Sequence, residues 1–393
     1  MLRRLRTTSL LALLIVLSAS NSLAETRGEL LSDLDALVDA SKSAQQVQGT
    51  SVAIVKDGEL ILARGYGMAD VENGVAATEH TVYRIGSVTK QFAAAAVLQL
   101  VDQGLVDLEA PASTYLPDYP WGEFQITVRQ LLDHTSGIKG YTEMPAFWEQ
   151  GRNDLSHQQM IDMMSSVPLE FEPGDRFQYS NSAYYLAGLI VEKVTGDSWA
   201  DYVEEEIFAP LGMRSSHYLY NDPIVPNRAE GYRLVDEELK NDDPLSMHLP
   251  YAAGALGSSV SDLMRWLKGL TSGEVMSEKS FKEMISSGQL NDGSDHGYGL
   301  GFFVGELDGH KMIEHAGGIN GFLSQLAWFP EDNLMIAVLC NSTDSSPGSL
   351  AAGLSRRVLG LDQPSWQPVA VSESELERYI GLYDAGRNPM PVA

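Results

Sequence analysis

The order of strand-like and helix-like segments predicts an α+β protein, with a central antiparallel sheet flanked by helices and an inserted, mostly helical subdomain. Residues 51–55 and 60–63 are rich in apolar and β-branched side chains and flank Asp57-Gly58, a dipeptide typical of hairpin turns. Strand-like segments return only after Gly297, whereas about 106–250 is mostly helical with long polar loops. Strands from both ends of the chain are therefore expected to complete one sheet around the inserted region.

The other elements follow from local patterns. Leucine and valine at helical spacing predict a surface helix over 29–48, and an alanine-rich run predicts a helix from about Val88 to Gly104. Thr127 and Gln130 have the spacing of a capping box. The order is completed by a helix over 182–194 that Gly196 ends, by strands over 298–304, 311–315, 322–329 and 334–341, and by a closing helix over 350–359.

The two ends of the chain carry their own signals. Residues 1–24 begin with three arginines among the first six residues, continue with an apolar run over 10–17, and end in small residues. This pattern predicts an export signal, and the apolar run is short for a membrane span, although a retained anchor is the alternative. Residues 366–393 form a C-terminal tail.

Charge and cysteine content exclude several kinds of partner and chemistry. The chain of 393 residues has a formal net charge of −26, and losing the three arginines of the signal would make it −29. Such an acidic protein is not expected to bind nucleic acid. Cys340 is the only cysteine, so an intrachain disulfide cannot form, and its apolar surroundings indicate a core residue.

The alanine-rich helix begins with Ser87-Val88-Thr89-Lys90, which places a hydroxyl and an amine on one face of the first turn. An adjacent amine can help to remove the serine proton, and helix N-terminal amides can stabilise an oxyanion. A helix N-cap is the structural alternative for Ser87. A second Ser-x-x-Lys, formed by Ser136 and Lys139, lies in a glycine-containing turn, so we do not expect its side chains to meet.

Other catalytic patterns are missing from the sequence. It contains no Gly-x-Ser-x-Gly, no His-Glu-x-x-His and no Gly-x-x-x-x-Gly-Lys, and its histidines do not cluster at metal spacings. We therefore expect neither a metal nor an organic cofactor.

Two further motifs accompany Ser87-x-x-Lys90. One is Tyr179-Ser180-Asn181, directly before a predicted helix, and the other is His315-Ala316-Gly317-Gly318, at the end of a predicted strand. This arrangement resembles the penicillin-recognising serine hydrolases, and is most similar to the branch with class C β-lactamases, D-Ala-D-Ala carboxypeptidases and related esterases. The resemblance implies a β-lactamase/transpeptidase-like fold, with residues 25–365 as the serine hydrolase domain.

The resemblance also implies roles for individual residues. Ser87 would be the nucleophile, with Lys90 and Tyr179 as the base system. The residues expected to bind substrate or stabilise the oxyanion are Asn181, His315, Gly317 and Gly318. Structural alternatives remain open: a buried core tyrosine at 179, a helix cap at 181 and a strand-end histidine at 315. His134 is expected to hold a loop rather than to take part in chemistry.

The function expected from these motifs is that of an exported, periplasmic or secreted serine hydrolase. It would act through an acyl-enzyme on amide or ester bonds of a small molecule or peptide, as a D-amino-acid peptidase, carboxypeptidase or esterase. A cell-wall D-amino-acid peptide is one such substrate, and stable membrane insertion is not expected after signal cleavage. Histidine in place of a permanently charged lysine at 315 makes a class C-like β-lactamase the less expected alternative. A catalytically silent protein that binds peptidoglycan peptides is another alternative.

Two further expectations concern the pocket and the tail. The loops over 120–155 and 218–251 are expected to line the pocket. Residues 376–383 resemble the first strand of a small β domain, either truncated or vestigial here.

Overall fold

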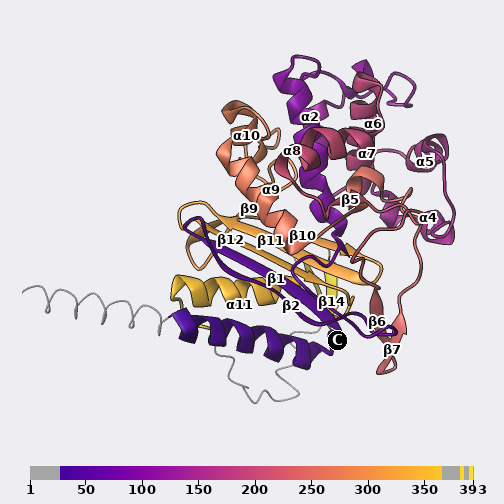
Figure 1. The fold of residues 1–393 in the computed structure, drawn as a ribbon. Coiled ribbons are helices and arrows are strands. Elements are labelled where there is room, and N and C mark those ends of the chain that lie inside the picture. The colour runs from indigo at the N-terminus through magenta and orange to yellow at the C-terminus, as the bar shows by residue number, and fades with distance from the viewer. Residues whose placement is uncertain (1–26, 365–380, 385–388, 393) are drawn as a thin grey trace, which may run out of the picture.

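The computed structural model describes residues 27–364, 381–384 and 389–392 (Figure 1). The expected export signal and residues 376–380 of the expected C-terminal strand lie outside the described residues. In the described part of the chain, no helix has the length and apolar character needed to cross a membrane.

Seven strands form one antiparallel sheet in the order β3-β2-β1-β12-β11-β10-β9. Its strands are β1 (Gly49–Lys56), β2 (Glu59–Asp70), β3 (Val75–Ala76), β9 (Phe303–Leu307), β10 (His310–Ile319), β11 (Phe322–Phe329) and β12 (Leu334–Cys340). Strand β1 pairs with β12 with Val52 opposite Val338, so the two ends of the chain meet in the middle of the sheet. The predicted fold class is confirmed.

The first hairpin forms where the sequence predicted it. Asp57 and Gly58 both have positive φ angles, 53° and 79°, as a tight two-residue turn between twisted strands requires. The buried residues of β1 occupy successive positions rather than alternate ones, because helices cover both faces of the sheet.

Helices lie on both faces of the sheet (Figure 1). The helix over residues 27–45 and α11 (Pro347–Leu359) cover one face, where Leu34 and Leu354 pack on strand residues such as Ile336. The opposite face carries α9 (Val260–Ser272), and beyond it the inserted helical region.

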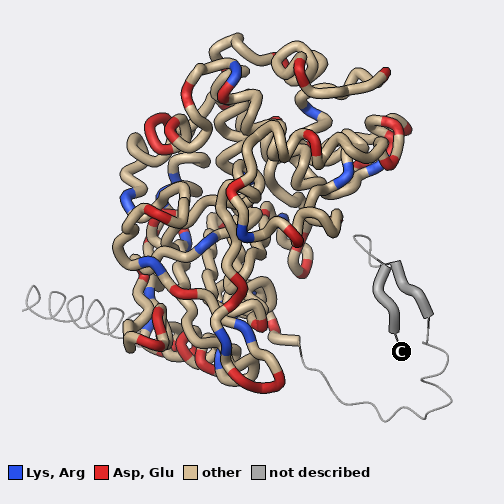
Figure 2. Tube along the Cα trace, turned by 90° about the vertical axis from the view of Figure 1, so that its right-hand side faces the viewer, with Lys and Arg blue, Asp and Glu red and all other residues tan. Residues whose placement is uncertain are grey.

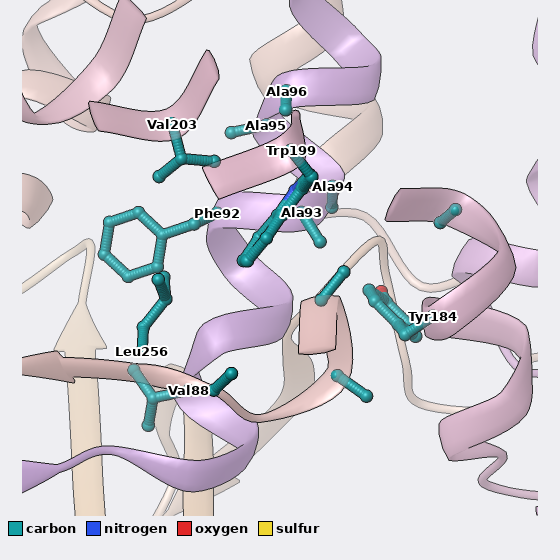
Figure 3. Close-up of a cluster of buried hydrophobic side chains, with 14 of the residues drawn as sticks. Val88, Phe92, Ala93, Ala94, Ala95, Ala96, Tyr184, Trp199, Val203 and Leu256 are labelled. Carbon is teal, nitrogen blue, oxygen red and sulfur yellow. The ribbon is translucent and has the colours of Figure 1, made fainter. Parts of the chain in front are cut away.

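Helix α2 (Thr89–Asp102) is the centre of the larger core (Figure 3). Phe92 and the alanines at 93–96 are fully buried, and Phe92 packs on Trp266 with 4.3 Å between ring centroids. Trp199 lies against the alanine side of the helix in Figure 3. Alanine therefore serves two purposes in this helix: it favours helix formation and lets large neighbours approach the backbone.

The inserted region is built mainly from short helices. Its α-helices are α3 (Val128–Leu132), α4 (Pro145–Glu149), α5 (His157–Met164), α6 (Asn181–Thr195), α7 (Trp199–Val203) and α8 (Ala209–Leu211), and α10 (Glu278–Met284) follows it in the chain. The capping box predicted at Thr127 and Gln130 is confirmed at the start of α3, and Gly196 ends α6 with a φ of 86°.

The structure also contains short strands that the sequence did not predict. Two small antiparallel sheets pair β4 (Tyr83–Arg84) and β5 (His217–Tyr218) with β8 (Leu256–Ser258), and β6 (Tyr232–Val235) with β7 (Glu238–Asn241). In the C-terminal tail, β13 (Gly381–Asp384) overlaps the end of the strand expected over 376–383 and pairs with β14 (Pro389–Val392), which was not predicted.

Two predicted strands have different bounds from those expected. The prediction of a strand over 298–304 is wrong for residues 298–302. Gly297 and Gly301 have φ angles of 75° and 88°, and this segment folds into a turn. The strand predicted to end at His315 continues to Ile319, because residues 316–319 remain paired with β11.

Candidate active site

Ser87 and Lys90 lie at the start of α2. Ser87 is in a single 3₁₀ turn over Gly86–Val88, and Lys90 is in the first turn of the α-helix that follows. The Lys90 Nζ atom lies 3.0 Å from the Ser87 Oγ atom. The N-cap residue of α2 is Val88, so Ser87 does not cap this helix. Ser87 is partly exposed whereas Lys90 is fully buried, so the hydroxyl is the accessible member of the pair.

Lys90 is held by two further oxygen atoms. Its Nζ atom lies 2.7 Å from Asn181 Oδ1 and 2.8 Å from the backbone carbonyl oxygen of Ala253. The rings of Tyr179 and Tyr184 lie beside it, with centroids 4.7 and 5.5 Å from Nζ. Burial lowers the pKa of Lys90 well below its usual value.

The three oxygen partners dictate the orientation of a neutral lysine. A neutral amine has two N–H donors and one lone pair, and both carbonyl oxygens can only accept. In its neutral form the amine would therefore donate to Asn181 and Ala253, and its lone pair would face the Ser87 hydroxyl. This geometry lets Lys90 accept the serine proton.

Asn181 is the first residue of α6, but it is not the helix cap. Ser180 is the N-cap residue, and its Oγ accepts from the Ala183 amide. The Asn181 side chain spans the site instead: Oδ1 accepts from Lys90 and Nδ2 donates to Thr142 Oγ1 at 3.0 Å.

Tyr179 packs in an aromatic cluster with His134. The two ring centroids are 4.2 Å apart, and His134 Nδ1 accepts a hydrogen bond from the Ser180 amide at 3.0 Å. Burial lowers the pKa of His134 well below its usual value, which keeps the imidazole neutral. The His134 carbonyl also accepts from the Gln178 amide, so this residue holds the segment that carries Tyr179.

The third motif lies in β10, next to the start of α2. A Cβ atom on Gly317 would overlap the Ile85 carbonyl oxygen, and one on Gly86 would lie 2.7 Å from the Gly318 amide nitrogen. The two glycines thus allow β10 to approach the residues that precede Ser87. Gly318 itself is exposed.

His315 is buried within β10 rather than placed at its end. Its Nε2 atom lies 3.0 Å from the Tyr298 hydroxyl, and its Nδ1 atom lies 2.5 Å from the Ala316 carbonyl oxygen. A carbonyl can only accept, so Nδ1 carries a proton; in the neutral ring Nε2 then accepts from the tyrosine. The His315 and Tyr179 ring centroids are 6.0 Å apart.

A hollow of about 630 Å³ adjoins Gly318. Both expected loops contribute to it, Trp148 and Arg152 from the first and Arg233 and Leu245 from the second. The full lining is Trp148, Gly151, Arg152, Arg233, Asp242, Asp243, Pro244, Leu245, Gly318, Ile319, Asn320, Leu323 and Thr343. The hollow combines an apolar wall with charges of both signs.

Three contacts at the site had no sequence signal. The Ala253 carbonyl belongs to the backbone, and Thr142 and Tyr298 stand in no recognised motif, although each contacts one of the predicted residues. The second Ser-x-x-Lys behaves as predicted: Ser136 Oγ accepts from the Ile138 amide, and Lys139 forms an ion pair with Glu170.

Charge and metal ligands complete the description of the site. The full sequence has 53 acidic and 27 basic residues, and Figure 2 shows the acidic ones spread over the described chain. In the part of the chain that the structure describes, no group of three or more His, Cys, Asp or Glu side chains is arranged to hold a metal ion.

Comparisons with protein-family models and with known proteins identify relatives of this chain. The Beta-lactamase family model matches residues 34–359. A penicillin-binding protein of Bacillus subtilis (strain 168) is 25% identical over 375 residues, covering 89% of this chain and 82% of the relative.

Solved structures are similar over most of the chain. The octameric penicillin-binding protein homologue from Pyrococcus abyssi is 30% identical with a TM-score of 0.72, covering 84% of this chain and 78% of that one. The D-amino acid amidase from Ochrobactrum anthropi SV3, complexed with L-phenylalanine amide, is 28% identical with a TM-score of 0.72, covering 84% and 96%.

Proposed function

This chain belongs to the Beta-lactamase family, a family of serine hydrolases, and we propose that it hydrolyses amide or ester bonds of D-amino-acid derivatives through an acyl-enzyme on Ser87. The observation that carries the proposal is the buried Lys90 amine, 3.0 Å from a partly exposed serine hydroxyl and held by two carbonyl oxygens.

The chemistry begins with proton transfer. Lys90 accepts the Ser87 proton while Oγ bonds to the substrate carbonyl carbon, and the carbonyl oxygen becomes an oxyanion. The amide or ester bond then breaks, and the leaving group takes up a proton from the Lys90–Tyr179 pair. A water molecule repeats the sequence on the acyl-enzyme, releasing the acid and regenerating Ser87.

The oxyanion is stabilised by the backbone amides of Ser87 and Gly318. Two features support this assignment: Gly318 is exposed, and it lies against the backbone of Gly86, the neighbour of Ser87. Amides fixed in a sheet and a helical turn need no reorganisation when charge develops.

His315 holds the aromatic cluster around Tyr179 in place, and we assign this role because of the contacts that the ring makes. The ring is buried, bonds to Tyr298 and packs near Tyr179. A neutral histidine supplies no permanent cation for the carboxylate of a β-lactam, which favours amides and esters as substrates.

The hollow next to Gly318 receives the substrate. Its apolar wall of Trp148, Leu245 and Leu323 suits an apolar side chain. Arg233 is paired with Asp243 at 2.8 Å, so the charged side of the hollow is internally balanced and does not favour a substrate of one charge.

Active-site labelling tests the proposal. The purified protein is incubated with a fluorophosphonate and with a fluorescent penicillin, and any adduct is located by mass spectrometry. We expect an adduct on Ser87 that disappears in Ser87→Ala. Absence of an adduct from the wild type would instead support a silent peptide-binding protein.

Substrate assays then distinguish the enzyme classes. We expect turnover of D-phenylalanine amide or short-chain nitrophenyl esters to exceed that of the L-amide. Rapid, sustained turnover of a chromogenic cephalosporin would instead identify a β-lactamase. Export is tested by fractionating expressing cells and sequencing the N-terminus, which should begin near Glu25 in the exported form.

A further inference from the structure

The carbonyl that faces Lys90 belongs to a strained turn. Ala253 ends a single 3₁₀ turn over Tyr251–Ala253, and Tyr251 has a φ of 44°, in the left-handed region. This conformation is unfavourable for a bulky residue and persists only where surrounding contacts hold it. The contacts of Tyr251 therefore bear on the position of the Ala253 oxygen.

Glu192 holds Tyr251 from helix α6. The Tyr251 hydroxyl donates to Glu192 Oε1 at 2.5 Å, and the same oxygen accepts from the Trp199 backbone amide at 3.0 Å. The Tyr251 ring is almost fully buried and packs on Tyr185 and Trp199, with centroids 4.7 and 5.6 Å away.

Helix α6 also allows the turn to lie unusually close. A Cβ atom on Gly188 would lie 2.5 Å from the Ala252 Cβ and 2.6 Å from Tyr251 Cε1. Gly188 and Glu192 are four residues apart, so they lie on one face of the helix. The turn packs on this face of the helix. The same helix begins with Asn181, whose side-chain carbonyl oxygen is the other carbonyl partner of Lys90.

We propose that Tyr251 and Glu192 are positioning residues for the base, a proposal that rests on the function proposed above. Their hydrogen bond fixes the turn so that the Ala253 carbonyl lies 2.8 Å from Lys90 Nζ. When this bond is lost, the turn relaxes toward ordinary φ angles and the carbonyl moves away from Lys90. The lysine lone pair then loses one of the two constraints that direct it at Ser87.

This role predicts a selective effect on catalysis. Among the described residues, neither Tyr251 nor Glu192 lines the hollow beside Gly318, so substrate binding should be little affected. Loss of the hydrogen bond should lower kcat by about tenfold and leave KM within about twofold.

Four variants of the full chain test the proposal. Tyr251→Phe removes the hydroxyl, Glu192→Met removes the acceptor, and Glu192→Gln keeps an acceptor oxygen. Tyr185→Phe is the matched control, because its hydroxyl is also buried in this cluster but contacts His157 Nδ1 at 2.8 Å and not the turn. The readouts are the rate of Ser87 labelling by a fluorophosphonate, kcat and KM for a nitrophenyl ester, and Tm.

We expect labelling and kcat to fall about tenfold in Tyr251→Phe and Glu192→Met, and to stay within about twofold in Glu192→Gln and Tyr185→Phe. Equal losses in Glu192→Gln and Glu192→Met would overturn the proposal, as would a Tyr251→Phe loss no larger than that of Tyr185→Phe. If Tyr251→Phe does not fold, the comparison of Glu192→Gln with Glu192→Met tests the proposal. Failure to label Ser87 in the wild type would refute the proposed function itself, and is visible before any variant is compared.

Discussion

Gly317→Ala is expected to damage both stability and Ser87 reactivity, because the added methyl group has no space. Its Cβ would overlap the Ile85 carbonyl oxygen and the Ser324 hydroxyl, and it would lie 3.0 Å from the Ile85 carbonyl carbon. Two of these three neighbours are backbone atoms and cannot rotate away. Strand β10 and the segment leading to Ser87 must therefore move apart.

The size of the effect follows from two contributions. Overpacking a close contact costs about 1–3 kcal/mol in free energy of unfolding. The displacement also breaks the 2.8 Å hydrogen bond from Ser324 Oγ to the Ile85 carbonyl, which contributes about 1 kcal/mol. We expect a loss of about 3 kcal/mol, which corresponds to a Tm roughly 4 °C lower in a domain of this size.

Thermal unfolding and Ser87 labelling measure this prediction, and the adjacent glycine provides the control. A Cβ on Gly318 would meet only the Leu323 Cδ2 atom, at 3.1 Å, which is the end of a flexible side chain. Gly318→Ala should therefore keep a Tm within about 1 °C of the wild type. Gly317→Ala should in addition label more slowly at temperatures where it is fully folded. An equal Tm for the two variants would refute the packing argument.

Three other predictions concern the surroundings of the site. Thr142→Val removes the partner of Asn181 Nδ2 and should slow Ser87 labelling about five- to tenfold without changing the Tm by more than a few degrees; an unchanged rate would show that the amide is held without it. Burial raises the pKa of Asp133 to about 6, so its contribution to stability is complete below about pH 4 and is lost as the pH rises through 6. Asp133→Asn should thus gain up to about 3 kcal/mol relative to the wild type between about pH 4 and 8 in urea titrations, and a constant difference would contradict the shift. Lys139→Met removes partly exposed ion pairs with Glu170 and Glu143 and should leave labelling within about twofold; a large loss would mean that the second Ser-x-x-Lys contributes to catalysis.

The sequence by itself determined the features that depend on neighbouring residues. Ser87 and Lys90 are three residues apart at the start of a helix, so their contact follows from helix geometry once the helix is recognised. The Asp57-Gly58 turn and the Thr127 capping box formed for the same reason, because their hydrogen bonds close over two to four residues. The sheet made from both ends of the chain followed from the order of these local patterns.

Only the tertiary structure decided the surroundings of the Lys90 amine. Its two carbonyl partners, on Asn181 and Ala253, are 91 and 163 residues away in the chain, and one of them is a backbone atom with no sequence signature. The lowered pKa of Lys90 comes from burial, which depends on packing between distant segments rather than on the residues beside it. Local patterns therefore located Ser87 and Lys90, whereas long-range contacts determine the burial and the hydrogen-bond partners of the lysine.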